Sequence, residues 1–133
     1  MLLAQAPTLT LVDPKKPYVV YTDASIRALG AVLFQRDDTG ILRPIWFASR
    51  LLLMAEKQYT VQELECLAVM FARKKFKHYL EEAEWICYTD HQAIINIMST
   101  NSLSARIQRW RVALCGENLT VHHVAGKDNV VAD

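Results

Sequence analysis

The hydrophobic pattern changes its period after three β-rich runs, and this change restricts the fold more than any other feature of the chain. The β-rich runs span residues 18–22, 28–35 and 41–48. From residue 60 to residue 80 apolar side chains recur at helical spacing, and the stretch contains neither glycine nor proline. Thr60 and Glu63 have the spacing of a capping box, which predicts a helix start at Thr60. We therefore expect antiparallel strands followed by a helix that covers them.

The second half of the chain alternates again between strand and helix signals. Strands are predicted over residues 85–89 and 119–124, and helices over residues 91–98, over residues 103–114 and from Asn129 onward. The order is three strands, a helix, a strand, two helices, a strand and a last helix. This order favours an α/β domain in which helices flank a five-stranded mixed sheet, with three antiparallel strands first and parallel strands after them.

Composition excludes several classes of protein. The 133 residues are 52% hydrophobic, which fits one domain with its own core. Fifteen Lys and Arg against fourteen Asp and Glu give a net charge of +1, so contact with nucleic acid would have to come from a local patch. The three cysteines lack the spacing of a zinc site, and no apolar stretch is long enough to span a membrane.

Two runs of basic residues are candidates for such a patch. The first contains Arg73, Lys74, Lys75, Lys77 and His78, and the second contains Arg106, Arg109 and Arg111. Either run could contact phosphate. For the first run, a solvated helix face balanced by Glu81, Glu82 and Glu84 is an equally good interpretation.

Three carboxylates fall where strands end or a helix begins. Asp23 ends the first strand and Asp90 follows the fourth, so parallel pairing of these strands would place both at one edge of the sheet. Glu65 lies in the first two turns of the long helix, on a side that can face the sheet. Clustered carboxylates repel one another unless a divalent cation compensates them. An aspartate at a strand end is also a common cap or turn residue, so position alone leaves both interpretations open.

Several motifs resemble the ribonuclease H domain of gypsy-type LTR retrotransposon (Metaviridae) reverse transcriptases, in the order in which that family has them. They are residues 21–25 (YTDAS), 30–33 (GAVL), 47–50 (FASR), 63–68 (ELECLA), 75–80 (KFKHYL), 88–91 (YTDH) and 126–133 (GKDNVVAD). The resemblance implies a ribonuclease H-like fold. It also implies an enzyme that hydrolyses the RNA strand of RNA/DNA hybrids during reverse transcription.

The resemblance also implies a catalytic and metal-binding set, Asp23, Glu65, Asp90 and Asp133. In the family these acids hold two Mg²⁺ ions, and Mn²⁺ is expected to substitute. Glu63 competes with Glu65 for the helix position, but the acid that precedes Cys66 matches the family pattern, which leaves Glu63 to the capping box.

A histidine ten residues before the last aspartate is common in related ribonucleases H, and this chain has His123 there. Its predicted role is to assist proton transfer and product release. The alternative, a polar residue on an exposed edge strand, applies equally to His122. Five further residues are weaker candidates for substrate contact, because each could equally be a cap or an exposed helix residue: Ser25, Thr60, Gln62, His91 and Gln92.

The expected partners are the RNA/DNA hybrid and the polymerase domain, either in cis or in a partner subunit, with no membrane. Only residues 99–102 separate the two predicted helices, so the basic extra helix of bacterial-type ribonucleases H is absent. Residues 1–16 are expected to be the lead-in from the polymerase part, and residues 17–133 a ribonuclease H domain with a truncated C-terminal helix. The expected location is the cytoplasm, in the virus-like particle of the element.

Two other functions predict different features of the sequence. A host-captured, catalytically silent copy could serve in dimerisation or interaction, although the four acids are intact. A transposase or integrase nuclease of the same broad fold would present the order Asp, Asp, Glu, whereas this chain presents Asp, Glu, Asp, Asp.

Overall fold

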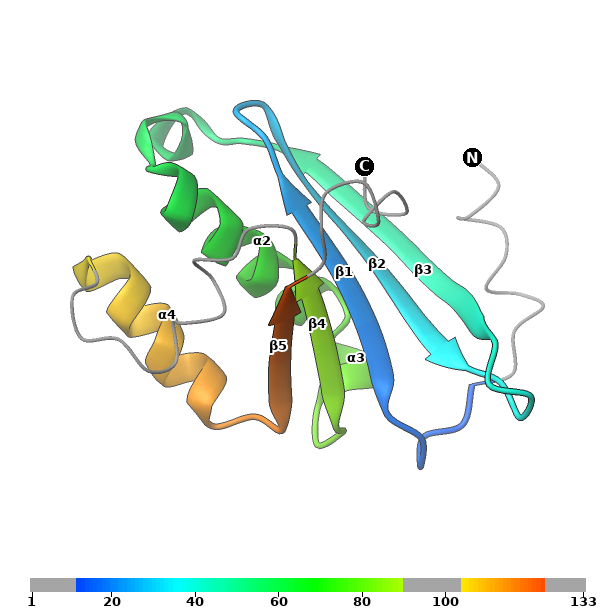
Figure 1. The fold of residues 1–133 in the computed structure, drawn as a ribbon. Helices are drawn as coiled ribbons and strands as arrows, with labels where there is room; N and C mark the ends of the chain where they lie inside the picture. Colours follow the sequence, from blue (N-terminus) through cyan, green and yellow to red (C-terminus); the bar gives the residue numbers. More distant parts are fainter. Residues whose placement is uncertain (1–11, 90–103, 124–133) are drawn as a thin grey trace.

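A computed structural model describes residues 12–89 and 104–123, which form one five-stranded sheet with helices packed against it (Figure 1). The elements in chain order are β1 (Tyr18–Ala24), β2 (Ala28–Arg36), β3 (Leu42–Leu51), η2 (Met54–Gln58), α2 (Val61–Lys75), α3 (Lys77–Leu80), β4 (Trp85–Thr89), α4 (Ala105–Cys115) and β5 (Leu119–His123). The predicted helices at residues 91–98 and from Asn129 lie outside the described residues.

The sheet has the strand order β3-β2-β1-β4-β5. β1 pairs antiparallel with β2, and β2 pairs antiparallel with β3, as expected for strands joined by short loops. β4 pairs parallel with both β1 and β5. Parallel neighbours need a long crossover, and α2 supplies it between β3 and β4. The predicted mixed sheet is therefore confirmed.

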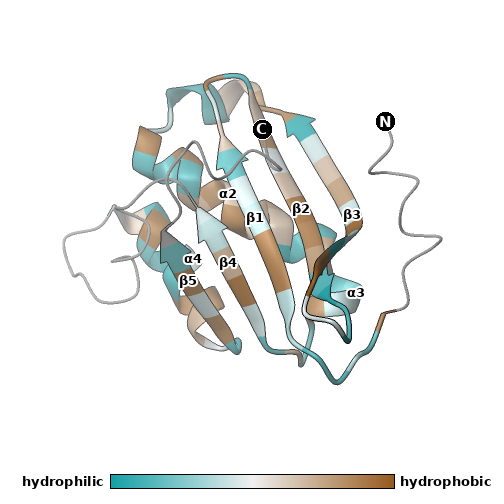
Figure 2. Ribbon diagram, turned by 45° about the vertical axis from the view of Figure 1, so that its right-hand side comes forward, coloured by the Kyte–Doolittle hydropathy of each residue, from teal (hydrophilic) through white to brown (hydrophobic). Residues whose placement is uncertain are grey.

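Each face of the sheet has its own hydrophobic cluster. The larger cluster lies between the sheet and the helices, where α2 packs against β1 and β2, and it includes the fully buried Val20, Phe76 and Trp85. The smaller cluster, on the opposite face, contains Val19 and Val32 together with other residues of the central strands. Figure 2 shows hydrophobic residues along β1 and β2 and hydrophilic residues at the arrowhead of β1. Polar residues are thus present where β1 ends.

The long helix predicted to run from residue 60 to residue 80 is interrupted. α2 ends at Lys75, and the separate short helix α3 begins at Lys77. Phe76 lies between them with a φ of −100° and a ψ of 20°, outside the helical range, and its side chain is fully buried. The regular helix is thus interrupted at a residue whose side chain is held in the core. The apolar period runs through the break, so the sequence pattern could not reveal it.

The remaining boundaries differ by a few residues from those predicted. β3 extends three residues further than its β-rich run, to Leu51, where it still pairs with Ala28. α4 begins after Ser104, whose hydroxyl accepts a hydrogen bond from the backbone N–H of Ile107 (3.2 Å). In the described part of the chain, no helix is long and apolar enough to cross a membrane.

Phe76→Ala should lower the free energy of unfolding by about 3–5 kcal/mol, because it removes a fully buried aromatic ring and leaves a cavity. Urea denaturation followed by tryptophan fluorescence measures the change. Val112→Ala, at a position that is 71% exposed, serves as the control and should change stability by less than about 0.5 kcal/mol. A small effect at Phe76 would show that this residue is not the anchor of the α2–α3 break.

Candidate active site at the ends of the parallel strands

The candidate site lies at the end of the sheet where the parallel strands finish. β1, β4 and β5 run in the same direction, toward the upper end of the sheet in Figure 1. Asp23, the penultimate residue of β1, is in register with Gly30 of β2 and is half-buried. α2, which carries Glu65, begins at this same end and runs down toward α3 (Figure 1). The structure thus brings the elements that carry Asp23 and Glu65 to one end of the sheet.

Asp23 and Glu65 approach this end from different faces. Strand alternation places Asp23 on the same face as Val19 and Tyr21, opposite the helices. Glu65 comes from α2 on the helical face and is only 5% exposed. The fully buried hydroxyl of Thr22, the residue before Asp23 in β1, lies 3.7 Å from the thiol of Cys87 in β4. This contact joins β1 to β4 next to the position of Asp23.

The acids that the structure describes fit the chemistry of a divalent metal site. Burial of a carboxylate costs free energy unless hydrogen bonds or a cation compensate it, and carboxylate oxygens are the ligands that Mg²⁺ and Mn²⁺ prefer. Within residues 12–89 and 104–123, no three His, Cys, Asp or Glu side chains gather into a metal-binding group. Asp90 and Asp133 lie outside those residues. The four-acid set therefore stays a prediction.

Glu63 is committed to helix capping, as the sequence predicted. One carboxylate oxygen accepts the backbone N–H of Thr60 (2.9 Å), while the Thr60 hydroxyl accepts the N–H of Glu63 (3.1 Å). The other oxygen accepts hydrogen bonds from the Ser104 hydroxyl (3.1 Å) and the Arg106 guanidinium (3.0 Å). The Thr60 N–H foremost, with Ser104 and Arg106, holds the pKa of Glu63 below its usual value. The sequence predicted the contact with Thr60, but no local pattern indicated the two partners on α4.

Ser25, Thr60 and Gln62 lie beside the candidate acids. The Ser25 hydroxyl accepts the N–H groups of Arg27 and Ala28 (both 3.1 Å) and so closes the turn between β1 and β2. Thr60 caps α2, and Gln62 is half-buried in its first turn. Ser25 and Thr60 therefore have structural roles, and contact with a hybrid stays a prediction for all three. His91 and Gln92 lie outside the described residues.

The two adjacent histidines end β5. His123 is in register with Thr89, and His122 is in register with Tyr88. The His122 ring centroid lies 5.6 Å from that of Tyr88, which stacks on Tyr21 at 5.1 Å. β5 is the edge strand next to β4, so His123 is near the predicted site in the fold. Its catalytic role stays a prediction.

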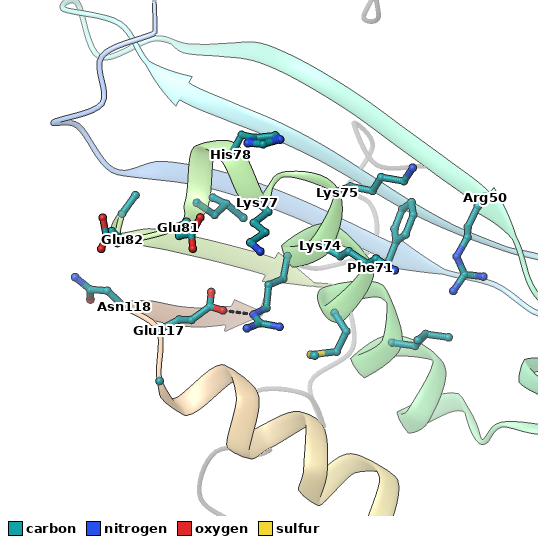
Figure 3. Close-up of a pocket in the computed structure, with 16 residues that line it drawn as sticks. Arg50, Phe71, Lys74, Lys75, Lys77, His78, Glu81, Glu82, Glu117 and Asn118 are labelled. Atoms are coloured by element: carbon teal, nitrogen blue, oxygen red, sulfur yellow. Dashed lines mark hydrogen bonds and ion pairs between the residues drawn. The ribbon is translucent and has the colours of Figure 1, made fainter.

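A groove of about 1200 Å³ lies at the other end of α2 (Figure 3). Its walls are the C-terminal half of α2, α3 and the connection from α4 to β5. Arg73 forms an ion pair across the groove with Glu117, which also accepts a hydrogen bond from the fully buried Trp85 (3.2 Å). Neither Asp23 nor Glu65 lines this groove. No local sequence pattern indicated the link through Glu117, because its partners are distant in the chain.

The remaining members of the first basic run line the same groove, and all four are exposed: Lys74, Lys75, Lys77 and His78. Within residues 12–89 and 104–123 none of them forms an ion pair, so the predicted balance by Glu81, Glu82 and Glu84 is not made by direct contact. In the second run, Arg106 is bound to Glu63 and lies 4.1 Å from the centre of the Tyr59 ring. Arg106 is thus occupied within the fold.

The sheet order and the crossover helix are those of an RNase H-like fold. Residues 13–116 match the family model described as an RNase H-like domain found in reverse transcriptase, and the chain belongs to this family. Over 132 residues it is 39% identical to the retrovirus-related Pol polyprotein from transposon 297 of Drosophila melanogaster, covering 99% of the chain and 12% of that protein. It is 37% identical to the Pol polyprotein from transposon gypsy of the same organism over 122 residues, covering 91% of the chain and 11% of that protein. The predicted gypsy-type relationship is confirmed, and the chain spans about an eighth of the first of these relatives.

Solved structures support the same fold. The foamy viral protease-reverse transcriptase in complex with RNA/DNA hybrid aligns with a TM-score of 0.69 at 20% identity, covering 86% of this chain and 16% of that one. LC11-RNase H1 in complex with RNA/DNA hybrid aligns with a TM-score of 0.68 at 16% identity, covering 87% of this chain and 91% of that one. The predicted ribonuclease H-like fold is therefore confirmed.

Glu63→Gln should lower the free energy of unfolding at neutral pH by about 1–3 kcal/mol, because it weakens charged hydrogen bonds to Ser104 and Arg106. The folded-state pKa of Glu63 lies below 4.5, so its stabilisation is present above that pH and is lost as the pH falls through the lowered value. The free energies of unfolding of wild type and variant should therefore converge in acid. Urea denaturation at a series of pH values from neutral into acid tests this. Glu84→Gln, at an exposed position, is the control. A stability difference between wild type and Glu63→Gln that grows in acid would contradict the stabilising role of the Glu63 carboxylate.

Proposed function

We propose that this chain is a metal-dependent endonuclease that hydrolyses the RNA strand of RNA/DNA hybrids. The observation that carries the proposal is the meeting of β1, β4 and the start of α2 at one end of the sheet, with Asp23 half-buried and Glu65 buried there. Membership in the reverse transcriptase RNase H-like family supports it. The foamy viral protein and LC11-RNase H1, which share the fold, are named as complexes with RNA/DNA hybrid.

Asp23, Glu65, Asp90 and Asp133 are the residues that would hold two Mg²⁺ ions, or Mn²⁺ in their place. When bound, such ions activate the attacking water and stabilise the leaving oxygen. The low exposure of Glu65 keeps bulk water away from its carboxylate, which strengthens its attraction for a cation. The water oxygen bonds to phosphorus as the bond to the 3′-oxygen breaks, which leaves 5′-phosphate and 3′-hydroxyl ends. His123 would receive or return a proton during this exchange.

Selectivity for the hybrid would rest on contacts to the 2′-hydroxyl groups of the RNA strand. Ser25, Thr60, Gln62, His91 and Gln92 are the candidates for these contacts. We further propose that the protein works beside a polymerase domain, in cis or in a partner subunit, inside a cytoplasmic virus-like particle. The polyprotein relatives support a neighbouring domain in cis, since the part of each that matches this chain is about an eighth or less.

Asp23→Asn and Glu65→Gln should each reduce cleavage by about 10³-fold or more, because each removes an anionic ligand with little change of shape. The assay is cleavage of a labelled RNA/DNA hybrid with Mg²⁺ or Mn²⁺, beside single-stranded and duplex RNA. The matched control is Asp38→Asn, since Asp38 is an exposed loop carboxylate paired with Lys16, and this variant should cleave normally. Normal turnover in either test variant would refute the site. A wild type that binds hybrid and cuts nothing would instead favour a silent interaction module.

Hybrid binding should depend little on the groove at the far end of α2. The triple substitution Lys74→Gln, Lys75→Gln, Lys77→Gln should leave hybrid affinity and its salt dependence nearly unchanged, because these lysines lie at the end of α2 remote from Glu65. Fluorescence anisotropy with a labelled hybrid, in Ca²⁺ at several salt concentrations, measures both quantities. A fall of the logarithmic salt slope by about 2 or more would show that these lysines contact phosphate.

A further inference from the structure

The carboxylate of Glu63 joins the N-terminal caps of two helices. Through one oxygen it accepts the Thr60 N–H at the start of α2, and through the other it accepts the hydroxyl of Ser104, the N-cap of α4. Ser104 at the same time accepts the N–H of Ile107, so its hydroxyl caps α4 while it donates to Glu63. A capping box needs only the contacts between Glu63 and Thr60. The hydrogen bond from Ser104 to Glu63 ties α2 to an element 41 residues away in the chain.

Arg106 completes this junction. Its guanidinium donates to the same Glu63 oxygen at 3.0 Å and stands 4.1 Å from the centre of the Tyr59 ring, within the range of a cation–π contact. The Tyr59 ring lies in turn 6.1 Å from the ring of Trp110 on α4. Glu63, Ser104, Arg106, Tyr59 and Trp110 therefore form one connected unit, which we call the cap junction.

The cap junction bears directly on Glu65, which follows Glu63 by two residues in α2. A helix leaves its first backbone N–H groups without intrahelical partners, so its first turns fray unless other groups satisfy them. Metal ligands must be held within about 0.5 Å of their working positions. Anchoring the first turn to both Thr60 and α4 limits the movement of the backbone that carries Glu65. Arg106 also offsets the charge of Glu63, which would otherwise repel a second anion in the same two turns.

We propose that Glu63 is a positioning residue, which through Ser104 and Arg106 holds the start of α2 against α4 so that Glu65 presents its carboxylate to the metal. Arg106 serves this link and not the nucleic acid. The inference rests on the proposed function, in which Glu65 is a metal ligand. It assigns a role in the site to α4, an element that contributes none of the four predicted metal ligands.

The chain contains a matched control at the other end of α2. Glu117 also joins α2 to a distant element, through its ion pair with Arg73 and its hydrogen bond from Trp85. Glu117→Gln should therefore weaken a tie of the same kind without touching the turn that carries Glu65. A purely structural role for Glu63 predicts that Glu63→Gln and Glu117→Gln behave alike in every assay.

The test measures Mn²⁺ affinity of the full chain without substrate, from the electron paramagnetic resonance signal of free Mn²⁺, beside urea denaturation. We expect Glu63→Gln and Arg106→Ala to weaken Mn²⁺ binding by about 10-fold or more, the range of ligand-orienting partners, and Arg106→Lys to recover part of the loss. Glu117→Gln should lower stability while its Mn²⁺ affinity stays within about 2-fold of wild type. In Ca²⁺, Arg106→Ala should bind hybrid with an unchanged salt slope, since Arg106 contacts no phosphate.

Two results overturn the inference. Unchanged Mn²⁺ affinity in Glu63→Gln and Arg106→Ala would show that the cap junction only stabilises the fold, and an equal loss in Glu117→Gln would show the same. If Arg106→Ala reduces the logarithmic salt slope of hybrid binding by about 1, Arg106 contacts a phosphate. Glu65→Gln separates this failure from that of the proposed function. If Glu65→Gln abolishes Mn²⁺ binding, only the positioning role has failed, whereas intact binding in Glu65→Gln refutes the metal site and the positioning role together.

Discussion

The parallel pairing of β1 with β4 determines where the candidate site lies. Antiparallel neighbours would place the ends of the two strands at opposite edges, whereas parallel pairing in register from Tyr18↔Trp85 to Tyr21↔Tyr88 brings both ends to one edge. The pairing also requires a long crossover, and α2 begins at that same edge because β3 delivers the chain there (Figure 1). The location of Asp23 and Glu65 is thus a consequence of one strand pairing.

Glu63 and Glu65 are both buried and lie two residues apart in α2, but their surroundings suit them to different roles. Glu63 and Glu65 are exposed by 6% and 5%, so both must be compensated within the fold. Glu63 is compensated by donors on both of its oxygens, from Thr60, Ser104 and Arg106. A carboxylate whose two oxygens are already occupied in this way is a poor metal ligand. Helical geometry turns Glu65 by about 200° from Glu63, away from those donors. The metal-binding interpretation therefore fits Glu65 better than Glu63.

The sequence predicted those features that depend on local signals. Strand alternation, the glycine-free and proline-free helix and the capping box all act over a few residues, and β1, the start of α2 and the Thr60–Glu63 contact lie where these signals placed them. Features that depend on contacts between distant residues were not accessible. The break at Phe76 falls at a side chain held in the core, and the contacts of Glu63 with Arg106 and of Glu117 with Arg73 join different helices and loops. For the candidate site, position came from the strand ends, while the choice of Glu65 over Glu63 needed the family pattern.

The distribution of positive charge limits how strongly this chain alone could attract a polyanion. With 15 basic against 14 acidic residues, the net charge of +1 provides no general attraction for nucleic acid. Arg50, Arg73 and Arg106 are each paired with a glutamate inside the fold. The exposed lysines that form no ion pair in the described part of the chain include Lys74, Lys75 and Lys77, at the end of α2 remote from Glu65. Affinity for a hybrid rises with the number of phosphates neutralised. In the described part of the chain, Arg27 in the β1–β2 turn and Lys57 just before α2 are exposed cations at the site end of the sheet, and two such charges can neutralise only a few phosphates. On the proposed function, the neighbouring polymerase domain holds the duplex, and the contribution of this domain is the geometry of its acids.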